Sequence, residues 1–314
     1  MDILTCTDKK FVIPTGVMIY SVCKNNQAET LNFHVIIDNS VTEDLKNEIL
    51  EETSRFSNVS LVFHKIDISN IRASLVVKNS AFPVSIYYRL LMTELLPEDI
   101  DKILYLDSDI VVCHNLRELW LFNIQDRPLA AVINQSDGGK FYKRLGLPSD
   151  KDYFNSGVML VNFNYWRNNQ CSKKLINYVQ ENPKVLVFPD QDALNYVFQD
   201  SKLLLPIKYN VQEKFFRANL SSFNKKFEKE ISSAIYDPYI LHYTGAKPWF
   251  TKCSHPLKSI YYQYKNETHW KNNMLMENRY RSNRKSFKKR IKNILDIMLG
   301  RSKPSPVYIE INSK

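Results

Sequence analysis

The chain has 314 residues, of which 44% are hydrophobic and 12% aromatic, so it can bury a sizeable core in one large domain or in a domain with an appendage. Its five cysteines are odd in number, widely spaced and without a C-x-x-C pair, which argues against a disulfide framework or a thiolate zinc site and favours a reducing compartment. With only seven glycines and no G-x-G-x-x-G or P-loop motif, a nicotinamide dehydrogenase or a P-loop kinase is not expected.

The formal net charge of +10 is concentrated near the end of the chain. Ten Lys and Arg residues lie between Arg279 and Lys303 against one acid, Asp296, so residues 1–278 are nearly neutral. This distribution argues against nucleic acid as a partner of the globular part. No signal peptide is expected, because the start carries an acid and no basic segment. No apolar stretch reaches the roughly 18 residues that a membrane-spanning helix needs.

Strand and helix patterns alternate along the chain, which predicts an α/β domain with a central sheet. Strands are expected at 3–7, 32–38, 59–66, 103–112, 130–134, 157–162, 203–207 and 239–243. Helices are expected at 14–24, 42–56, 85–96, 166–181 and 191–198. Thr42 is the predicted N-cap of its helix, and Pro97 is expected to end the helix at 85–96.

Asp107 and Asp109 lie between two apolar runs, 103–106 and 110–112, in a segment that is typical of a buried strand. Carboxylates at such a place need a compensating cation, because their unpaired burial costs several kcal/mol. A divalent metal is the simplest compensation, since Mg²⁺ and Mn²⁺ prefer oxygen ligands and keep positions for a substrate phosphate. Three other Asp-x-Asp triplets compete with this pair, but only this pair has a predicted strand on both sides; the competing triplets begin at Asp99, Asp150 and Asp190.

Three further polar residues lie at predicted ends of elements, where ligands bind in open α/β sheets. Asp8 follows the first strand and is either a hydrogen-bond acceptor for a base or ribose or a turn residue. Asn155 precedes the strand at 157–162 and either bonds a sugar hydroxyl or completes a turn. Asp190 precedes a predicted helix and is either a ligand or an N-cap.

The segment 242–249 follows the last predicted strand. His242 is either a third metal ligand or a structural histidine, and a lone histidine is more often structural. Lys247 is a candidate phosphate clamp, and Gly245 would permit close approach of the backbone.

In this order the segments resemble the family 8 glycosyltransferases, which include bacterial lipopolysaccharide galactosyl- and glucosyltransferases and, more distantly, glycogenin. The resemblance covers about residues 1–270 and rests on Asp8, Tyr105-Leu106-Asp107-Ser108-Asp109, Phe154-Asn155-Ser156-Gly157, Asp190-Gln191-Asp192, His242-Tyr243-Thr244-Gly245 and Lys247-Pro248-Trp249. It implies a GT-A fold, a Rossmann-like nucleotide-binding domain whose mixed central sheet is flanked by helices. It further implies a retaining transfer of glucose or galactose from UDP-glucose or UDP-galactose to a glycan, such as a lipid-linked surface polysaccharide of the lipopolysaccharide type.

The resemblance also implies roles for single residues. The equivalents of Asp107, Asp109 and His242 hold a divalent metal, usually Mn²⁺ (or Mg²⁺), against the UDP diphosphate. The other implied donor-binding residues are Thr7, Asp8, Lys9, Lys10, Phe11 and Ser108 near the nucleotide, Arg89 and Asn155 near the sugar, and Gly245 and Lys247 at the diphosphate. Asp190 and Gln191 match the catalytic region; an amide is a poor nucleophile, so Gln191 is expected to position the sugar. One residue separates Gly245 from Lys247 where the family usually has two, which puts the reach of Lys247 in question.

Residues 271–314 are expected to form a tail separate from the catalytic domain at 1–270. Within 284–299, apolar residues recur at helical spacing beside a basic face; they are Phe287, Ile291, Ile294, Leu295 and Met298. Such a basic amphipathic helix suits an anionic membrane surface, and the alternative is a helix packed on the domain. The membrane interpretation predicts a cytoplasmic enzyme on the inner face of the cell membrane.

Three other functions are alternatives. A sugar-nucleotide pyrophosphorylase would need a glycine-rich basic loop near the first strand, which is missing. A non-catalytic UDP-sugar-binding or scaffold protein would share the same fold. The segment 103–111 also matches the strand pattern of Asp-x-Asp phosphatases, although a nucleophile near the chain start and a later Gly-Asp-x-x-x-Asp motif are missing. The acceptor is expected to bind to loops at 70–83, 135–151 and 212–230, whose sequences do not identify it.

Overall fold

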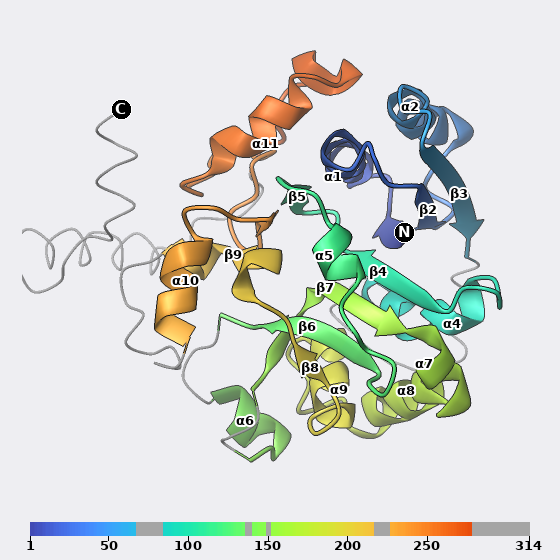
Figure 1. Cartoon of the computed structure of the whole chain (residues 1–314), viewed down its shortest axis with the longest axis vertical. Coiled ribbons are helices and arrows are strands. Elements are labelled where there is room, and N and C mark those ends of the chain that lie inside the picture. Colours follow the sequence, from blue (N-terminus) through green and yellow to red (C-terminus); the bar gives the residue numbers. More distant parts are fainter. Residues whose placement is uncertain (67–83, 136–139, 149–151, 217–226, 278–314) are drawn as a thin grey trace, which may run out of the picture.

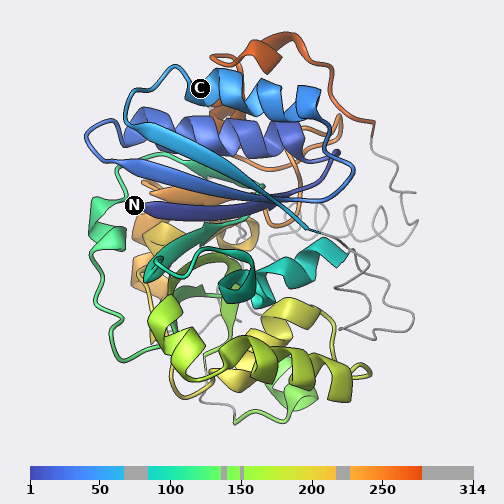
Figure 2. The same cartoon turned by 90° about the vertical axis from the view of Figure 1, so that its right-hand side faces the viewer.

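The protein is described by a computed structural model for residues 1–66, 84–135, 140–148, 152–216 and 227–277. A seven-stranded sheet lies at its centre with helices on both faces, and a smaller three-stranded sheet lies beside it (Figure 1). Figure 2 shows the central sheet with α1 (Val12–Asn25) and α2 (Glu43–Thr53) on one side and α7 (Phe163–Asn168), α8 (Cys171–Glu181) and α9 (Pro189–Val197) on the other. The predicted α/β class, with a mixed sheet flanked by helices, is confirmed.

The strand order of the central sheet is β3-β2-β1-β4-β7-β6-β8. Its strands are β1 (Asp2–Thr7), β2 (Leu31–Ile37), β3 (Val59–Lys65), β4 (Lys102–Leu106), β6 (Leu129–Ile133), β7 (Phe154–Asn162) and β8 (Leu203–Leu204). All pairs are parallel except those of β7, which runs antiparallel to both β4 and β6. The smaller sheet has the order β5-β10-β9, with β5 (Ile110–Val112), β9 (Val211–Gln212) and β10 (Ile240–His242).

Alternation along the strands divides the core into two layers. On β4, Leu104 and Leu106 pack into the cluster that contains α1, whereas Ile103 and Tyr105 pack into the cluster on the opposite face. The layers consist of α1 (Val12–Asn25) and α2 (Glu43–Thr53) on one face and α7 (Phe163–Asn168), α8 (Cys171–Glu181) and α9 (Pro189–Val197) on the other. Shorter elements are η1 (Val84–Leu90), α4 (Met92–Leu95), α5 (Arg117–Trp120), α6 (Lys140–Leu145), η2 (Ile207–Tyr209), η3 (Glu213–Phe216) and α10 (Glu228–Ala234).

Several predicted elements are confirmed and three are wrong. Thr42 caps α2 as predicted, because its Oγ1 accepts the N–H of Leu45 at 3.4 Å. The predicted helix at 85–96 is instead η1 followed by α4, separated at Leu91. The predicted helix at 166–181 is two helices, because Gln170 between them adopts a left-handed conformation with φ of 51°.

The predicted strand at 103–112 is also wrong, and its interruption matters for the site. β4 belongs to the central sheet and β5 to the smaller one, so Asp107-Ser108-Asp109 forms the turn between two sheets. The residues on both sides of the pair are apolar and typical of strands, so the sequence does not indicate that the chain passes from one sheet to another here.

Strand directions gather the predicted polar residues at one edge of the central sheet. β1 and β4 are parallel, so Asp8 and Asp107, which follow them, lie at the same edge. β7 runs the opposite way and therefore begins at this edge with Phe154 and Asn155. His242 ends β10 and pairs with Ile110 of β5, which brings it beside the turn between the sheets.

The C-terminal part of the described chain packs back onto the domain. α11 (Lys258–Lys265) lies against α1, and η6 (His269–Asn272) places Trp270 over Gly16, where an added Cβ would overlap the Trp270 ring. η6 crosses the predicted domain boundary at 270, and Met276 forms a bridge with Phe250. The division into 1–270 and 271–314 stays a prediction, and the predicted helix at 284–299 lies outside the described residues. Within the described part, no helix combines the length and apolar character needed to cross a bilayer.

Candidate active site

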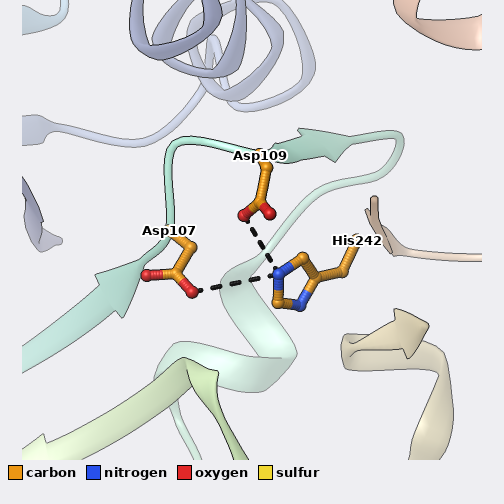
Figure 3. A group of neighbouring side chains, drawn as sticks. All are labelled: Asp107, Asp109 and His242. Atoms are coloured by element: carbon orange, nitrogen blue, oxygen red, sulfur yellow. Dashed lines mark hydrogen bonds and ion pairs between the residues drawn. The ribbon is translucent and has the colours of Figure 1, made fainter. Parts of the chain in front are cut away.

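Asp107, Asp109 and His242 converge at the turn between the two sheets (Figure 3). His242 Nε2 lies 3.0 Å from Asp109 Oδ1 and 3.9 Å from Asp107 Oδ2, and one ligand atom from each residue lies within 4.8 Å of the others. His242 is buried, while the two carboxylates keep a small exposed fraction, 21% for Asp107 and 16% for Asp109. The three predicted metal ligands therefore lie together, and solvent still reaches the two carboxylates.

Gly157 of β7 forms one wall of this group. Its carbonyl accepts the N–H of Asp107 at 2.9 Å, which ties the turn to β7. A Cβ at Gly157 would overlap His242 Cε1 and lie 2.7 Å from Asp107 Oδ2. Only glycine leaves space here for the two side chains and a cation between them, so the donor set and its surroundings fit a divalent metal.

Lys247 reaches the carboxylate of Asp109 despite its short spacing from Gly245. Its Nζ pairs with Asp109 Oδ2 and donates to the carbonyl of Tyr243 at 2.6 Å. Burial alone would favour the protonated form of Asp109. Lys247 and His242 outweigh burial and lower the pKa of Asp109 well below its usual value, so this carboxylate is ionised at neutral pH.

Arg89 of η1 links Asp107 to Asp190. Its guanidinium donates to Asp107 Oδ1 at 2.8 Å, and its Nε lies 3.1 Å from Asp190 Oδ2. It also donates to the carbonyl of Ser156 at 3.1 Å and lies 4.7 Å from the centre of the Tyr105 ring. Burial raises the pKa of Asp190, and Arg89 offsets this rise in part.

Asp190 and Gln191 lie in the first turn of α9, facing the start of β7. The N-cap of α9 is Phe188, without a side-chain cap bond, so the N-cap interpretation of Asp190 is wrong. Gln191 Oε1 accepts from Asn155 Nδ2 at 3.0 Å and from the N–H of Ser156 at 3.1 Å. Asn155 is thus part of a buried polar group with Gln191 and does not complete a surface turn.

The predicted nucleotide-side residues surround the turn after β1. Asp8 Oδ1 accepts the N–H of Lys10 at 2.8 Å, as in the turn interpretation, and its side chain stays half-buried. Thr7 is buried and its hydroxyl accepts from Thr15 at 2.9 Å. Lys9 is exposed, as is Lys10.

Two contacts connect the turn after β1 with the segments that carry Asp107, Asp109 and His242. Ser108 Oγ donates to the carbonyl of Cys6 on β1 at 3.0 Å, which holds the Asp107–Asp109 turn against the first strand. The ring of Phe11 meets the ring of Trp249 edge to face at 6.1 Å, which joins the start of α1 to the segment after His242.

Several residues that contact the site residues from the protein interior were not predicted from the sequence. Asn210 accepts from His242 Nδ1 at 2.9 Å, yet it lies beside the two-residue strand β9, which has no recognisable pattern. Asp192 is fully buried and pairs with Arg144 at 2.7 Å; the Asp-x-Asp triplet at 190–192 was the available signal. Gly245 is packed against Glu213, whose carboxylate a Cβ would overlap.

Comparisons with known proteins agree with this geometry. The model of glycosyl transferase family 8 matches residues 2–253. A lipopolysaccharide 1,2-glucosyltransferase of Escherichia coli is 30% identical over 84% of this chain and 78% of its own length. General stress protein A of Bacillus subtilis is 29% identical over 86% of this chain and 94% of its own length. The crystal structure of the galactosyltransferase LgtC with donor and acceptor sugar analogues has a TM-score of 0.75 at 23% identity. It covers 86% of this chain and 96% of LgtC, which confirms the predicted GT-A fold.

Proposed function

The chain belongs to glycosyl transferase family 8, and on this premise we propose that it transfers glucose or galactose from UDP-glucose or UDP-galactose to a glycan. The observation that carries the proposal is the group of Asp107, Asp109 and His242 with two cationic side chains, Arg89 and Lys247, in contact with its carboxylates. A diphosphate donor needs such a place, where its charge can be balanced by a metal and by side-chain cations.

The metal would be held by one oxygen from each aspartate and by His242 Nε2. This mixed set of carboxylate and imidazole ligands suits Mn²⁺, with Mg²⁺ as the alternative. When bound, the ion would act as a Lewis acid that stabilises negative charge on the leaving UDP.

Lys247 would contribute a second positive charge to the leaving diphosphate. Its ammonium group already lies at Asp109, the carboxylate that the proposed metal shares, so the lysine and the diphosphate would meet at this point. In a partly buried site, a fixed ammonium stabilises developing charge more strongly than it does in bulk solvent. Gly245, two residues earlier, would let the loop backbone approach the phosphates.

The donor sugar would lie between Arg89, Asn155 and the first turn of α9. Arg89 is fixed by carboxylates on both sides, Asp107 and Asp190, which aims its guanidinium without requiring the substrate to order it. Gln191 would position the sugar, because its amide oxygen already accepts two hydrogen bonds and amides are weak nucleophiles. The transfer is proposed to retain the anomeric configuration, by front-face attack or by double displacement.

The nucleotide would bind at the turn after β1. Asp8 would accept a hydrogen bond from uracil, and the segment from Thr7 to Phe11, with Ser108 nearby, would line the base and ribose. Lys9 and Lys10 are exposed and would add positive charge on the phosphate side.

The acceptor is proposed to be a lipid-linked surface glycan such as lipopolysaccharide, in keeping with the named function of the Escherichia coli relative. The enzyme would then act in the cytoplasm at the inner face of the cell membrane, with residues 284–299 on the anionic lipid surface. Deletion of 279–314 should release the protein from liposomes that contain anionic lipid but not alter its UDP-sugar hydrolysis. Unchanged liposome binding would contradict the membrane role.

The central test is UDP release from UDP-glucose and UDP-galactose, with and without Mn²⁺. Asp109→Ala should abolish the metal-dependent turnover while the far-ultraviolet circular dichroism spectrum stays that of the native protein. Metal-dependent activity of this variant would refute the site. A wild-type protein that binds UDP with Mn²⁺ and yet turns over none of the donors would instead support the scaffold alternative.

A further inference from the structure

Behind the metal ligands lies a buried hydrogen-bond chain that begins at His242. His242 Nδ1 lies 2.9 Å from Asn210 Oδ1, and Asn210 Nδ2 donates to Asn155 Oδ1 at 2.9 Å. Asn155 Oδ1 also accepts the backbone N–H of Gly157 at 3.0 Å. A backbone N–H can only donate, so the amide of Asn155 cannot be reversed. This fixes Asn210 in turn, and Nδ1 of His242 must therefore carry a proton.

The chain continues from Asn155 to Gln191 and Tyr153 in the same direction. Asn155 Nδ2 donates to Gln191 Oε1, which also accepts the backbone N–H of Ser156. Gln191 Nε2 then donates to the hydroxyl of Tyr153 at 3.1 Å. The second backbone N–H fixes the orientation of Gln191 as the first fixes that of Asn155.

The far end of the chain is a buried carboxylate. The Tyr153 hydroxyl donates to Asp192 Oδ1 at 2.7 Å, and Asp192 is fully buried. Arg144 donates to both of its oxygens, at 2.7 and 2.8 Å, and the N–H groups of Val187 and Phe188 donate to Oδ2. These donors hold Asp192 as an acceptor, so every donor from His242 onward points toward it.

From this chain we propose that Asn210 and Asp192 are positioning residues, which keep a proton on Nδ1 of His242 and so leave Nε2, the ring atom beside Asp107 and Asp109, as the nitrogen that can bind a metal. The proposal rests on the metal site of the proposed function and adds what orients its imidazole ligand. Histidine ligands need such a partner on the second nitrogen, because it fixes both the tautomer and the ring plane. Because Gln191 is a member of the chain, the same bonds also set the amide that would face the donor sugar.

The test is Mn²⁺ affinity, measured by electron paramagnetic resonance of free Mn²⁺ with the full chain. Asn210→Ala should weaken Mn²⁺ binding by about 10- to 100-fold, the usual effect of losing a partner of a histidine ligand. Asn210→Asp keeps an acceptor for Nδ1 but loses the donor to Asn155, so its affinity should lie between those of the wild type and Asn210→Ala. Equal affinity of Asn210→Ala and the wild type would overturn the proposal.

Tyr153→Phe tests the remote end with the loss of one oxygen atom. It should weaken Mn²⁺ binding less than Asn210→Ala does, since the ring keeps its stacking on Phe141 and only the two hydrogen bonds of the hydroxyl, from Gln191 and to Asp192, are lost. The matched control is Tyr20→Phe, which also removes a hydroxyl bonded to a carboxylate, that of Glu267, but outside the chain. An equal loss of affinity in both variants would overturn a specific role for the chain.

Nitrogen-15 spectra of the histidine rings in metal-free protein give a readout that does not depend on activity or on metal. His242 should show a protonated Nδ1 in the wild type, whereas in Asn210→Ala the ring proton should shift to Nε2, which lies 3.0 Å from Asp109 Oδ1. A wild-type His242 that carries its only proton on Nε2 would refute the proposal by itself. Wild-type protein with the expected tautomer but no Mn²⁺ affinity would refute the metal site of the proposed function and leave the positioning chain supported.

Discussion

Gly157→Ala tests whether the space between the proposed metal ligands is what the site requires. The new Cβ would lie 2.7 Å from Asp107 Oδ2, about 0.7 Å inside the 3.4 Å at which ordinary contact begins, and it would overlap His242 Cε1. Neither neighbour is free to yield: Asp107 Oδ1 is held by Arg89 and Tyr105, and His242 by Asn210. Overpacking of this kind costs about 1–3 kcal/mol.

If Asp107 and His242 move apart to relieve this overlap, bringing them back to bind the metal costs the overpacking energy, which weakens the free energy of metal binding by that amount. We expect Mn²⁺ affinity to fall by about tenfold to 100-fold, because each 1.4 kcal/mol is about tenfold in a binding constant. The assay is Mn²⁺ titration followed by electron paramagnetic resonance, with urea unfolding of the metal-free protein alongside.

The control is Gly146→Ala, the same change in the loop after α6. Gly146 has φ of 67° and no atom near its Cβ position, so alanine there is strained at a cost of about 1 kcal/mol but displaces no ligand. It should lower stability and leave Mn²⁺ affinity unchanged. Wild-type affinity in Gly157→Ala, or equal losses in the two variants, would refute the reasoning.

Two further predictions concern stability. Lys247 and His242 lower the pKa of Asp109 below its ordinary 3.8, so their stabilisation is complete above about pH 4 and is lost as pH falls further. Lys247→Met should therefore lower the Tm of metal-free protein at pH 7 by about 2–4 °C for each kcal/mol lost, and by less at pH 2; equal shifts would contradict this. Gly16→Ala should displace Trp270 and destabilise the fold by about 1–3 kcal/mol in urea without changing Mn²⁺ affinity, and unaltered stability would show that η6 is not anchored there.

The sequence predicted the structure well at positions where one residue type has one common local role. Thr42 was predicted as a cap and serves as one, because a hydroxyl before a helix has few other roles. The breaks at Leu91 and Gln170 were not predicted, since helical periodicity continues across both. Gln170 takes a positive φ that the sequence would sooner assign to glycine or asparagine.

In the site, too, features set by local sequence were predicted and features set by distant residues were not. Asp107, Asp109 and His242 were candidates because each lies within or at the end of a predicted strand and matches a family motif, and the structure brings the three together. Asn210 was not, because its role depends on where β9 pairs, and a two-residue strand leaves no alternation to detect. Arg144 and Asp192 are 48 residues apart, and their pairing exists only once α6 has packed beside α9.

The positions of Asp107, Asp109 and His242 depend on both sheets, because the turn that carries the two aspartates joins one sheet to the other. Asp107 is held by β4 through its pairing with β7, whereas Asp109 and His242 are held by the register of β5 on β10, in which Ile110 opposes His242. A slip of one residue in that register would turn the His242 side chain to the other face of the strand. The spacing of the two aspartates is therefore only part of the site. The third proposed ligand, His242, is placed by a strand pair that brings together residues far apart in the chain, since Asp109 and His242 are separated by 133 positions.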